Sequence, residues 1–207
     1  MVKVKICGIT NLDDALHALE CGADALGFNF YNKSSRFISS ADAREITRQL
    51  GSVLKVGVFV NEHVDVIAET VENTGLDAVQ LHGDESPALV RELGELVSCE
   101  VIKAFRVSPE FIAESVFEYG ANTILLDGFS LDAHGGTGET FDWGIAKQLS
   151  SSVKLYLAGG LSGDNVRQAI LDVSPYAVDA CSLLESAPGK KDPQKVKRFI
   201  LEAKRND

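Results

Sequence analysis

The chain has 207 residues, 45% of them hydrophobic, and a formal net charge of −10 at pH 7. This length suits one well-cored domain, and the negative charge disfavours binding to nucleic acid or to an anionic membrane surface. Without a span of about 18 apolar residues or a secretory leader pattern, we expect a cytoplasmic protein that does not enter membranes. The four cysteines lack zinc-ligand and disulfide spacings, so we expect free thiols and no metal.

Short apolar runs alternate with amphipathic segments along the entire chain. Eight runs are typical of buried strands: 3–7, 25–30, 54–60, 78–82, 101–105, 123–127, 154–158 and 176–181. The segments between them carry helix-start signals, such as Ser39 before Asp42, Ser108 before Pro109 and Asp192 before Pro193. Eight strand–helix repeats in about 200 residues predict an α/β fold, a single-domain (β/α)8 TIM barrel spanning residues 1–207.

Strand alternation predicts which side chains point into the barrel. In the first strand Lys5 and Cys7 point inward, and in the last strand Asp179 does so. In the fifth strand we expect Ile102 to face outward, which places Lys103 and Phe105 inside. A buried ammonium requires an anionic partner, so we expect Lys5 and Lys103 to pair with interior carboxylates such as Asp179.

The last inward residue of each strand lies at the carboxyl-terminal mouth, where barrels of this class place their active sites. Cys7, Asn29, His82, Asp127 and Cys181 occupy such positions. A thiol and a carboxyl that converge there can serve as base and acid in proton transfer. Each residue also has a structural interpretation: Cys7 as a buried hydrophobe, Asp127 as a loop cap and His82 as a hydrogen-bonded rim residue.

Glycine-rich loops follow the sixth and seventh strands, at 135–138 and 159–163. Backbone N–H groups in the loops after the last two strands commonly bind phosphate in barrels. The motifs of serine hydrolases, P-loop kinases and dinucleotide-dependent dehydrogenases do not occur in the sequence. We therefore expect proton-transfer chemistry and a phosphate-binding loop.

An ordered set of motifs resembles one enzyme family. They lie at 5–10, 35–36, 80–83, 125–127, 135–138, 157–166 and 185–192. Together they closely resemble phosphoribosylanthranilate isomerase, a barrel family of tryptophan biosynthesis, over the whole chain. The resemblance implies an Amadori rearrangement that converts N-(5-phosphoribosyl)anthranilate to 1-(2-carboxyphenylamino)-1-deoxyribulose 5-phosphate without a cofactor. We expect a monomer or a homodimer.

The resemblance also assigns roles to individual residues. It implies that Asp127 is the general acid that opens the ribose ring and that Cys7 is the base that removes the C2 proton. Arg36 is expected to hold the anthranilate carboxylate, because a guanidinium forms paired hydrogen bonds with a carboxylate. The other expected substrate contacts are His82, Gly136, Gly159, Gly160, Cys181 and Ser182.

The loop after the last strand departs from the family pattern, because Leu183 replaces a glycine and Cys181 replaces a serine. If that glycine has a positive φ or lets phosphate approach closely, Leu183 weakens the site by strain of roughly 1–2 kcal/mol or by steric block. Two alternatives stay open. One is a related aminoaldose-phosphate isomerase, although enzymes of that kind generally use a pair of aspartates, whereas position 7 here is a cysteine. The other is a catalytically silent barrel that acts as a binding module.

Overall fold

The protein is described by a computed structural model that covers residues 1–128 and 142–205. Its centre is a closed barrel of parallel strands that pair in chain order from β1 to β8. The strands are β1 (Lys3–Ile6), β2 (Ala25–Asn29), β3 (Leu54–Phe59), β4 (Ala78–Leu81), β5 (Glu100–Val107), β6 (Thr123–Gly128), β7 (Lys154–Leu157) and β8 (Ala177–Ala180). The barrel fold expected from the sequence is confirmed.

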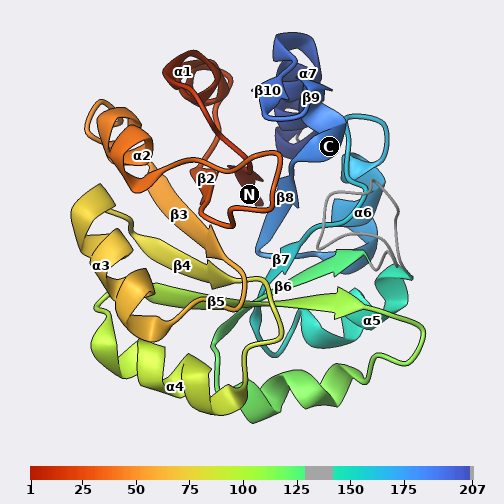
Figure 1. Cartoon of the computed structure of the whole chain (residues 1–207). Helices are drawn as coiled ribbons and strands as arrows, with labels where there is room; N and C mark the ends of the chain where they lie inside the picture. Colours follow the sequence, from red (N-terminus) through yellow and green to blue (C-terminus); the bar gives the residue numbers. More distant parts are fainter. Residues whose placement is uncertain (129–141, 206–207) are drawn as a thin grey trace.

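Helices surround the barrel as an outer ring (Figure 1). They are α1 (Leu12–Glu20), α2 (Ser40–Thr47), α3 (Val64–Thr74), α4 (Pro87–Leu96), η1 (Ala113–Tyr119), α5 (Trp143–Leu149), α6 (Val166–Val173), η2 (Ser182–Leu184) and α7 (Pro193–Lys204), of which η1 and η2 are 3-10 helices. Ser39 and Asp192 cap α2 and α7 as the sequence indicated. The expected start at Ser108 and Pro109 is wrong, because Ser108 instead accepts a turn hydrogen bond from Phe111 and η1 begins later.

Two apolar layers hold the fold together. A larger layer lies between the strands and the outer helices and includes Ile124 and Leu126 of β6. A smaller cluster fills the barrel and consists of Ala25, Val56, Ala78, Ile102, Ala104, Leu125, Tyr156, Ala158 and Ala177. Alternation of the β6 side chains between these layers is the expected pattern of a barrel strand.

Lys103 on β5 is an exception to the side-chain directions predicted from the sequence. Ile102 and Ala104 belong to the cluster inside the barrel, so Lys103 and Phe105 lie on its outer face. Lys103 Nζ lies 2.8 Å from Glu85 Oε2 and is almost fully buried. The prediction failed because a strand that is covered on both faces carries apolar residues on both, so the pattern does not identify the inner face. Outside the barrel, Glu85 supplies the carboxylate partner that the buried ammonium needs.

The two ends of the chain meet where the barrel closes. β1 pairs with β8, with Lys5 opposite Asp179 and Ile6 opposite Ala180, and α1 lies beside α7 (Figure 1). Beyond β8 the chain forms η2 and then an antiparallel hairpin of β9 (Glu185–Ala187) and β10 (Lys190–Lys191). This hairpin was not predicted from the sequence. Across the described residues, no helix is both long and apolar enough to span a membrane.

Candidate active site

A cavity of ≈ 370 Å³ lies at the carboxyl-terminal ends of the barrel strands. Its wall contains every expected site residue that the structure describes: Cys7, Arg36, His82, Asp127, Gly159, Gly160, Cys181 and Ser182. Gly136, the remaining expected contact, lies outside the described residues. Residues from distant parts of the sequence therefore converge on one cavity, as expected from their positions at strand ends.

Cys7 follows β1 and is buried in the cavity wall. A Cβ atom placed on Gly27 of the neighbouring strand would lie 2.7 Å from Cys7 Sγ, so a glycine there makes room for the thiol. Hydrogen bonding with the Cys181 thiol holds the pKa of Cys7 well below its usual value, and the charges of Lys5 and Lys191 act in the same direction against burial. The site therefore favours the Cys7 thiolate.

Lys5 and Asp179 form an ion pair inside the barrel. Lys5 is the inward-facing residue that precedes Cys7 along the first strand. Lys5 Nζ lies 3.0 Å from Asp179 Oδ1, and this pairing confirms the expectation from strand alternation. Burial lowers the pKa of Lys5, but Asp179 and Cys7 together raise it above its ordinary value. The permanently charged ammonium supplies a positive field beneath the thiol.

Asp127 faces the cavity from β6 and contacts His82. His82 Nε2 lies 3.2 Å from Asp127 Oδ2, and His82 Nδ1 lies 2.7 Å from Gln80 Nε2. With the Gln80 amide in this orientation, Nδ1 accepts a hydrogen bond and Nε2 carries the ring proton that faces the carboxyl group. His82 is thus both a hydrogen-bonded rim residue and part of the cavity wall.

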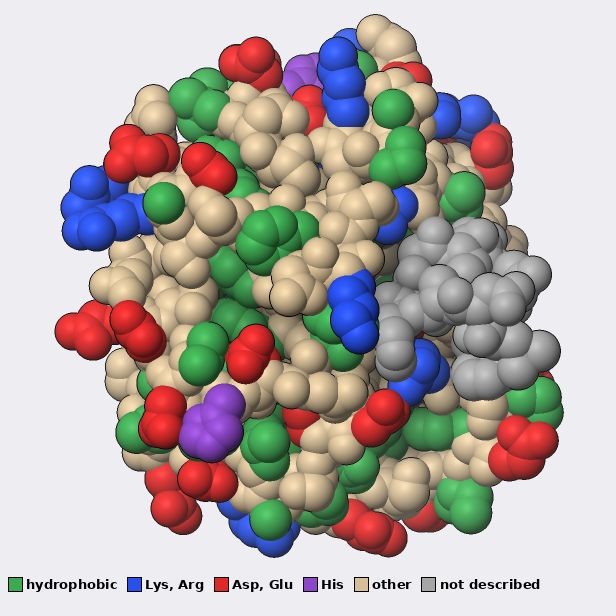
Figure 2. Space-filling view, viewed as in Figure 1, with side chains coloured by type: hydrophobic (Ala, Val, Ile, Leu, Met, Phe, Trp, Pro, Cys, Tyr) green, Lys and Arg blue, Asp and Glu red, His purple; other side chains and the backbone are tan. Residues whose placement is uncertain are grey.

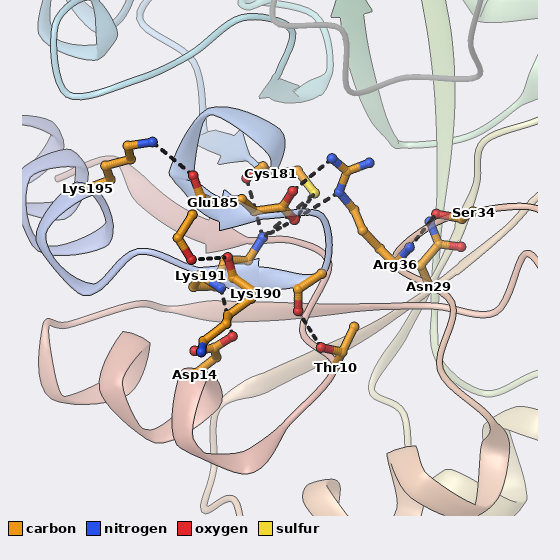
Figure 3. A network of polar contacts seen from close by, with 12 residues as sticks. Thr10, Asp14, Asn29, Ser34, Arg36, Cys181, Glu185, Lys190, Lys191 and Lys195 are labelled. Atoms are coloured by element: carbon orange, nitrogen blue, oxygen red, sulfur yellow. Dashed lines mark hydrogen bonds and ion pairs between the residues drawn. The ribbon is translucent and has the colours of Figure 1, made fainter.

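Arg36, in the loop after β2, forms a two-point ion pair with Glu185 (Figure 3). Arg36 Nε lies 2.9 Å from Glu185 Oε1, and its Nη2 lies 2.8 Å from Oε2. Lys191 Nζ reaches the same carboxylate at 3.1 Å. Cys181 lies beside these groups, with Lys191 Nζ 3.8 Å from its sulfur. The hairpin after β8 therefore fixes the arginine at the cavity wall.

Sequence reasoning missed Glu185 and Lys191 as parts of this site. Both belong to the hairpin, and both are buried although they are charged. The only signal was their place in the motif at 185–192, because strand alternation does not extend beyond β8. Acidic side chains are scattered over the face shown in Figure 2, many of them at its edge. The cations beside the cavity therefore counter an overall negative charge of −10 where an anionic ligand would bind.

The loop after β7 turns sharply at two glycines. Gly159 and Gly160 have φ angles of +81° and +65°, values that residues with side chains rarely adopt. A Cβ atom on Gly159 would overlap the backbone nitrogen of Gly128 and would lie 3.1 Å from Asp127 Oδ1. The main chain can therefore approach both a ligand and the Asp127 carboxyl group.

The loop after β8 begins η2 at Ser182. The first N–H groups of such a helix have no partner within it, so they can donate to an anion. Leu183 lines the cavity and is 38% exposed. It is not among the residues with a positive φ, so the expected backbone strain at this position is wrong. Steric block by the leucine side chain is the remaining way in which it could weaken phosphate binding.

The family model for N-(5'-phosphoribosyl)anthranilate isomerase matches residues 4–202. The chain belongs to this family. The isomerase of Citrifermentans bemidjiense is 50% identical over 206 residues, which are 99% of this chain and 98% of that protein.

Solved structures of the isomerase family agree over the same length. The phosphoribosylanthranilate isomerase of Thermotoga maritima superposes with a TM-score of 0.91 at 47% identity, with 99% of each chain covered. A second structure, of the isomerase in complex with reduced 1-(o-carboxyphenylamino)-1-deoxyribulose 5-phosphate, gives a TM-score of 0.87 at 46% identity, with the same coverage. The likeness therefore covers nearly the full length of both chains.

Proposed function

We propose that this protein is the isomerase that converts N-(5'-phosphoribosyl)anthranilate to 1-(2-carboxyphenylamino)-1-deoxyribulose 5-phosphate in tryptophan biosynthesis, in the cytoplasm. The family match over residues 4–202 carries this conclusion. The cavity adds chemical support, because a thiol with a lowered pKa and a carboxyl group face the same space. A reduced form of the product is bound in a relative that is 46% identical, which supports the same substrate class here.

In the first step Asp127 acts as the general acid. It gives a proton to the ribose ring oxygen as the ring opens, and the anthranilate nitrogen supplies the electron pair that forms a protonated Schiff base at C1. Asp127 suits this role because it lies at the cavity wall with its carboxyl group about nine-tenths buried and His82 3.2 Å away. His82 lies beside the carboxyl group in the wall of the same cavity.

In the second step Cys7 acts as the base. Its thiolate removes the proton from C2 of the Schiff base, and the C2–H electrons form the carbon–carbon double bond of an enolamine. The enolamine then tautomerises to the ketone product. The lowered pKa of Cys7 supports this role, since a base has to be deprotonated before it can accept a proton. Lys5 and Lys191 supply the positive charges that favour the thiolate.

Arg36 and the two loops after β7 and β8 bind the non-reacting ends of the substrate. A guanidinium has more N–H donors than the two that Glu185 accepts, so Arg36 retains donors for the anthranilate carboxylate. Gly159, Gly160 and Ser182 line the same cavity and offer backbone N–H groups for the phosphate. The active species is a monomer or a homodimer, and a 46% identical structure is of monomers generated from the dimeric Thermotoga maritima isomerase.

A fluorescence assay tests the function. N-(5'-phosphoribosyl)anthranilate is generated in the cuvette, and its fluorescence should fall when purified protein is added. Cys7→Ala should abolish the fall, whereas Cys21→Ala, a matched change near the end of α1, should retain it. An unchanged signal with the parent protein would favour the silent barrel. Faster turnover of a different aminoaldose phosphate would favour the related isomerase.

A further inference from the structure

Two cysteines meet at the mouth of the barrel, from the strands that close it. β1 and β8 are in register with Ile6 opposite Ala180, and the Cys7 N–H donates to the Ala180 carbonyl at 2.9 Å. The next residue on each strand is Cys7 or Cys181. Neighbouring strands lie about 4.8 Å apart, which falls within the Cα–Cα range of about 4.4–6.8 Å that a disulfide requires.

Both thiols also point the same way. Cys7 follows inward-facing Lys5 by two residues, and Cys181 follows inward-facing Asp179 by two, so strand alternation turns both sulfurs toward the mouth. Both residues line the same cavity. A Cβ atom on Gly8 would lie 2.8 Å from Cys181 Sγ, so the sulfur occupies space that only a glycine leaves open above β1.

The two thiols have opposite acidities. Hydrogen bonding between them lowers the pKa of Cys7 and raises that of Cys181. A nucleophilic thiolate beside a protonated thiol is the arrangement in which one cysteine reacts with an oxidant and the other resolves the product. Cys21 and Cys99 are partly buried, and burial raises the pKa of each.

We propose that Cys7 and Cys181 form an oxidisable pair that hydrogen peroxide or an alkyl hydroperoxide converts to a disulfide. The disulfide is reversed by a dithiol. Its effect on activity rests on the proposed function, in which Cys7 is the base, because a sulfur bonded to Cys181 cannot accept the C2 proton. Formation of the disulfide does not depend on that assignment.

The reaction proceeds in two balanced steps. The Cys7 thiolate attacks one peroxide oxygen, the O–O bond breaks, and a sulfenic acid and hydroxide form, the latter becoming water on protonation. Cys181 then attacks the sulfenic sulfur, the S–O bond breaks, and hydroxide leaves with the thiol proton as a second water. Two thiols and one hydrogen peroxide thus give one disulfide and two waters, with two electrons passing from sulfur to oxygen; an alkyl hydroperoxide gives one water and one alcohol instead.

The first step favours the second because it removes the negative charge of the Cys7 thiolate. Two of the causes that raise the pKa of Cys181 are its hydrogen bond with Cys7 and the charge of Cys7. The charge is lost once Cys7 is a neutral sulfenic acid, and any hydrogen bond that remains no longer involves a thiolate. Lys191, with Nζ 3.8 Å from the Cys181 sulfur, and Arg36 then favour the Cys181 thiolate against burial.

Peptide mapping of the full-length protein tests the inference. The reduced protein is treated with stoichiometric hydrogen peroxide, alkylated without reduction, digested and analysed by mass spectrometry. We expect a Cys7–Cys181 cross-linked peptide two hydrogens lighter than the reduced pair, and a loss of activity of roughly a hundredfold or more that dithiothreitol restores. Cys21→Ser and Cys99→Ser should give the same cross-link, since neither thiol lies in the cavity wall.

Cys181→Ser separates the two sulfurs. Without a resolving thiol, peroxide should leave a sulfenic acid at Cys7 that dimedone traps, and further oxidation should become irreversible to dithiothreitol. Failure of the parent protein to form the cross-linked peptide would overturn the inference, whatever its isomerase activity. A cross-linked protein that keeps full activity would leave the disulfide standing and would instead refute Cys7 as the base.

Discussion

The ring nitrogen Nε2 of His82 lies 3.2 Å from Oδ2 of Asp127, between the end of β4 and the end of β6. The other ring nitrogen of His82 is engaged by Gln80, one inward position earlier on β4. These contacts place the His82 ring beside the Asp127 carboxyl group at the cavity wall. A proton donor held in one orientation needs no reorganisation at the moment of reaction.

Asp127→Asn should lower kcat roughly 10²-fold or more, because an amide keeps the shape and the contact with His82 but has no acidic proton to donate. Steady-state kinetics with the fluorescence assay measure the loss. Asp164→Asn, at an exposed position before α6, is the matched control and should leave kcat unchanged. Normal turnover by Asp127→Asn would show that another group is the acid.

The lowered pKa of Cys7 predicts a distinct pH dependence. The thiolate should persist on the acid side, so alkylation of Cys7 by iodoacetamide should continue at pH values where Cys99, whose pKa is raised by burial, no longer reacts. The value of kcat/KM should fall as pH drops through the midpoint of Cys7 alkylation. Peptide-level mass spectrometry gives both midpoints. Cys181→Ala should move that of Cys7 upward, and a Cys7 midpoint at or above that of Cys99 would contradict the thiolate.

Arg36→Lys should raise KM roughly ten- to a hundredfold, because loss of a charge-assisted hydrogen bond costs about 1.5–3 kcal/mol. A lysine keeps the charge but cannot bind Glu185 at two points and a substrate carboxylate together. The change in kcat should be smaller, since the contact forms already in the ground state. Arg44→Lys on α2 is the control. Equal KM values for Arg36→Lys and the parent would place the anthranilate carboxylate elsewhere.

Leu183→Ala should lower KM as much as Leu183→Gly does, roughly fivefold or about 1 kcal/mol. Leu183 has no positive φ, so a glycine relieves no backbone strain and only the removed side chain matters. Leu171→Ala, an exposed position on α6, serves as the control. A lower KM with glycine alone would instead indicate that phosphate binding requires a different backbone conformation in the loop.

Lys5→Met should destabilise the protein by about 3–5 kcal/mol, because it leaves the Asp179 carboxylate buried without its partner. The double change Lys5→Met with Asp179→Leu should cost less than the sum of the two single changes, since no charge then remains unpaired. Urea unfolding followed by circular dichroism gives the free energies of unfolding. Strictly additive losses would mean that the two side chains do not interact.

The local pattern of apolar and polar residues predicted much of the fold. Alternation with a period of two residues placed Lys5 and Asp179 inside the barrel, and the structure pairs them at 3.0 Å. The same rule failed for Lys103, because each barrel strand is covered on both faces and the pattern there cannot distinguish inside from outside. The contact with Glu85 that settles its direction comes from the loop after the neighbouring strand, which is tertiary information.

The candidate site was predicted where it lies at strand ends and was missed where the chain folds back. Cys7 and Asp127 follow from strand parity alone. Glu185 and Lys191 do not, because their burial arises when the hairpin after β8 packs against the loop that carries Arg36. The proximity of Cys181 to Cys7 requires the register of β1 against β8, which only barrel closure sets.

Gly159 lies directly beside Asp127 in the cavity wall. Its main chain is packed so closely against Gly128 and the Asp127 carboxyl group that a side chain at 159 would meet both. The turn that we assign to the phosphate and the group that we assign to ring opening are therefore held at a fixed spacing by the packed backbone of two neighbouring strands. The site therefore selects substrates by the distance between the phosphate and the ring oxygen. A sugar phosphate with a matching distance brings its ring oxygen to the acid, and a longer or shorter one does not.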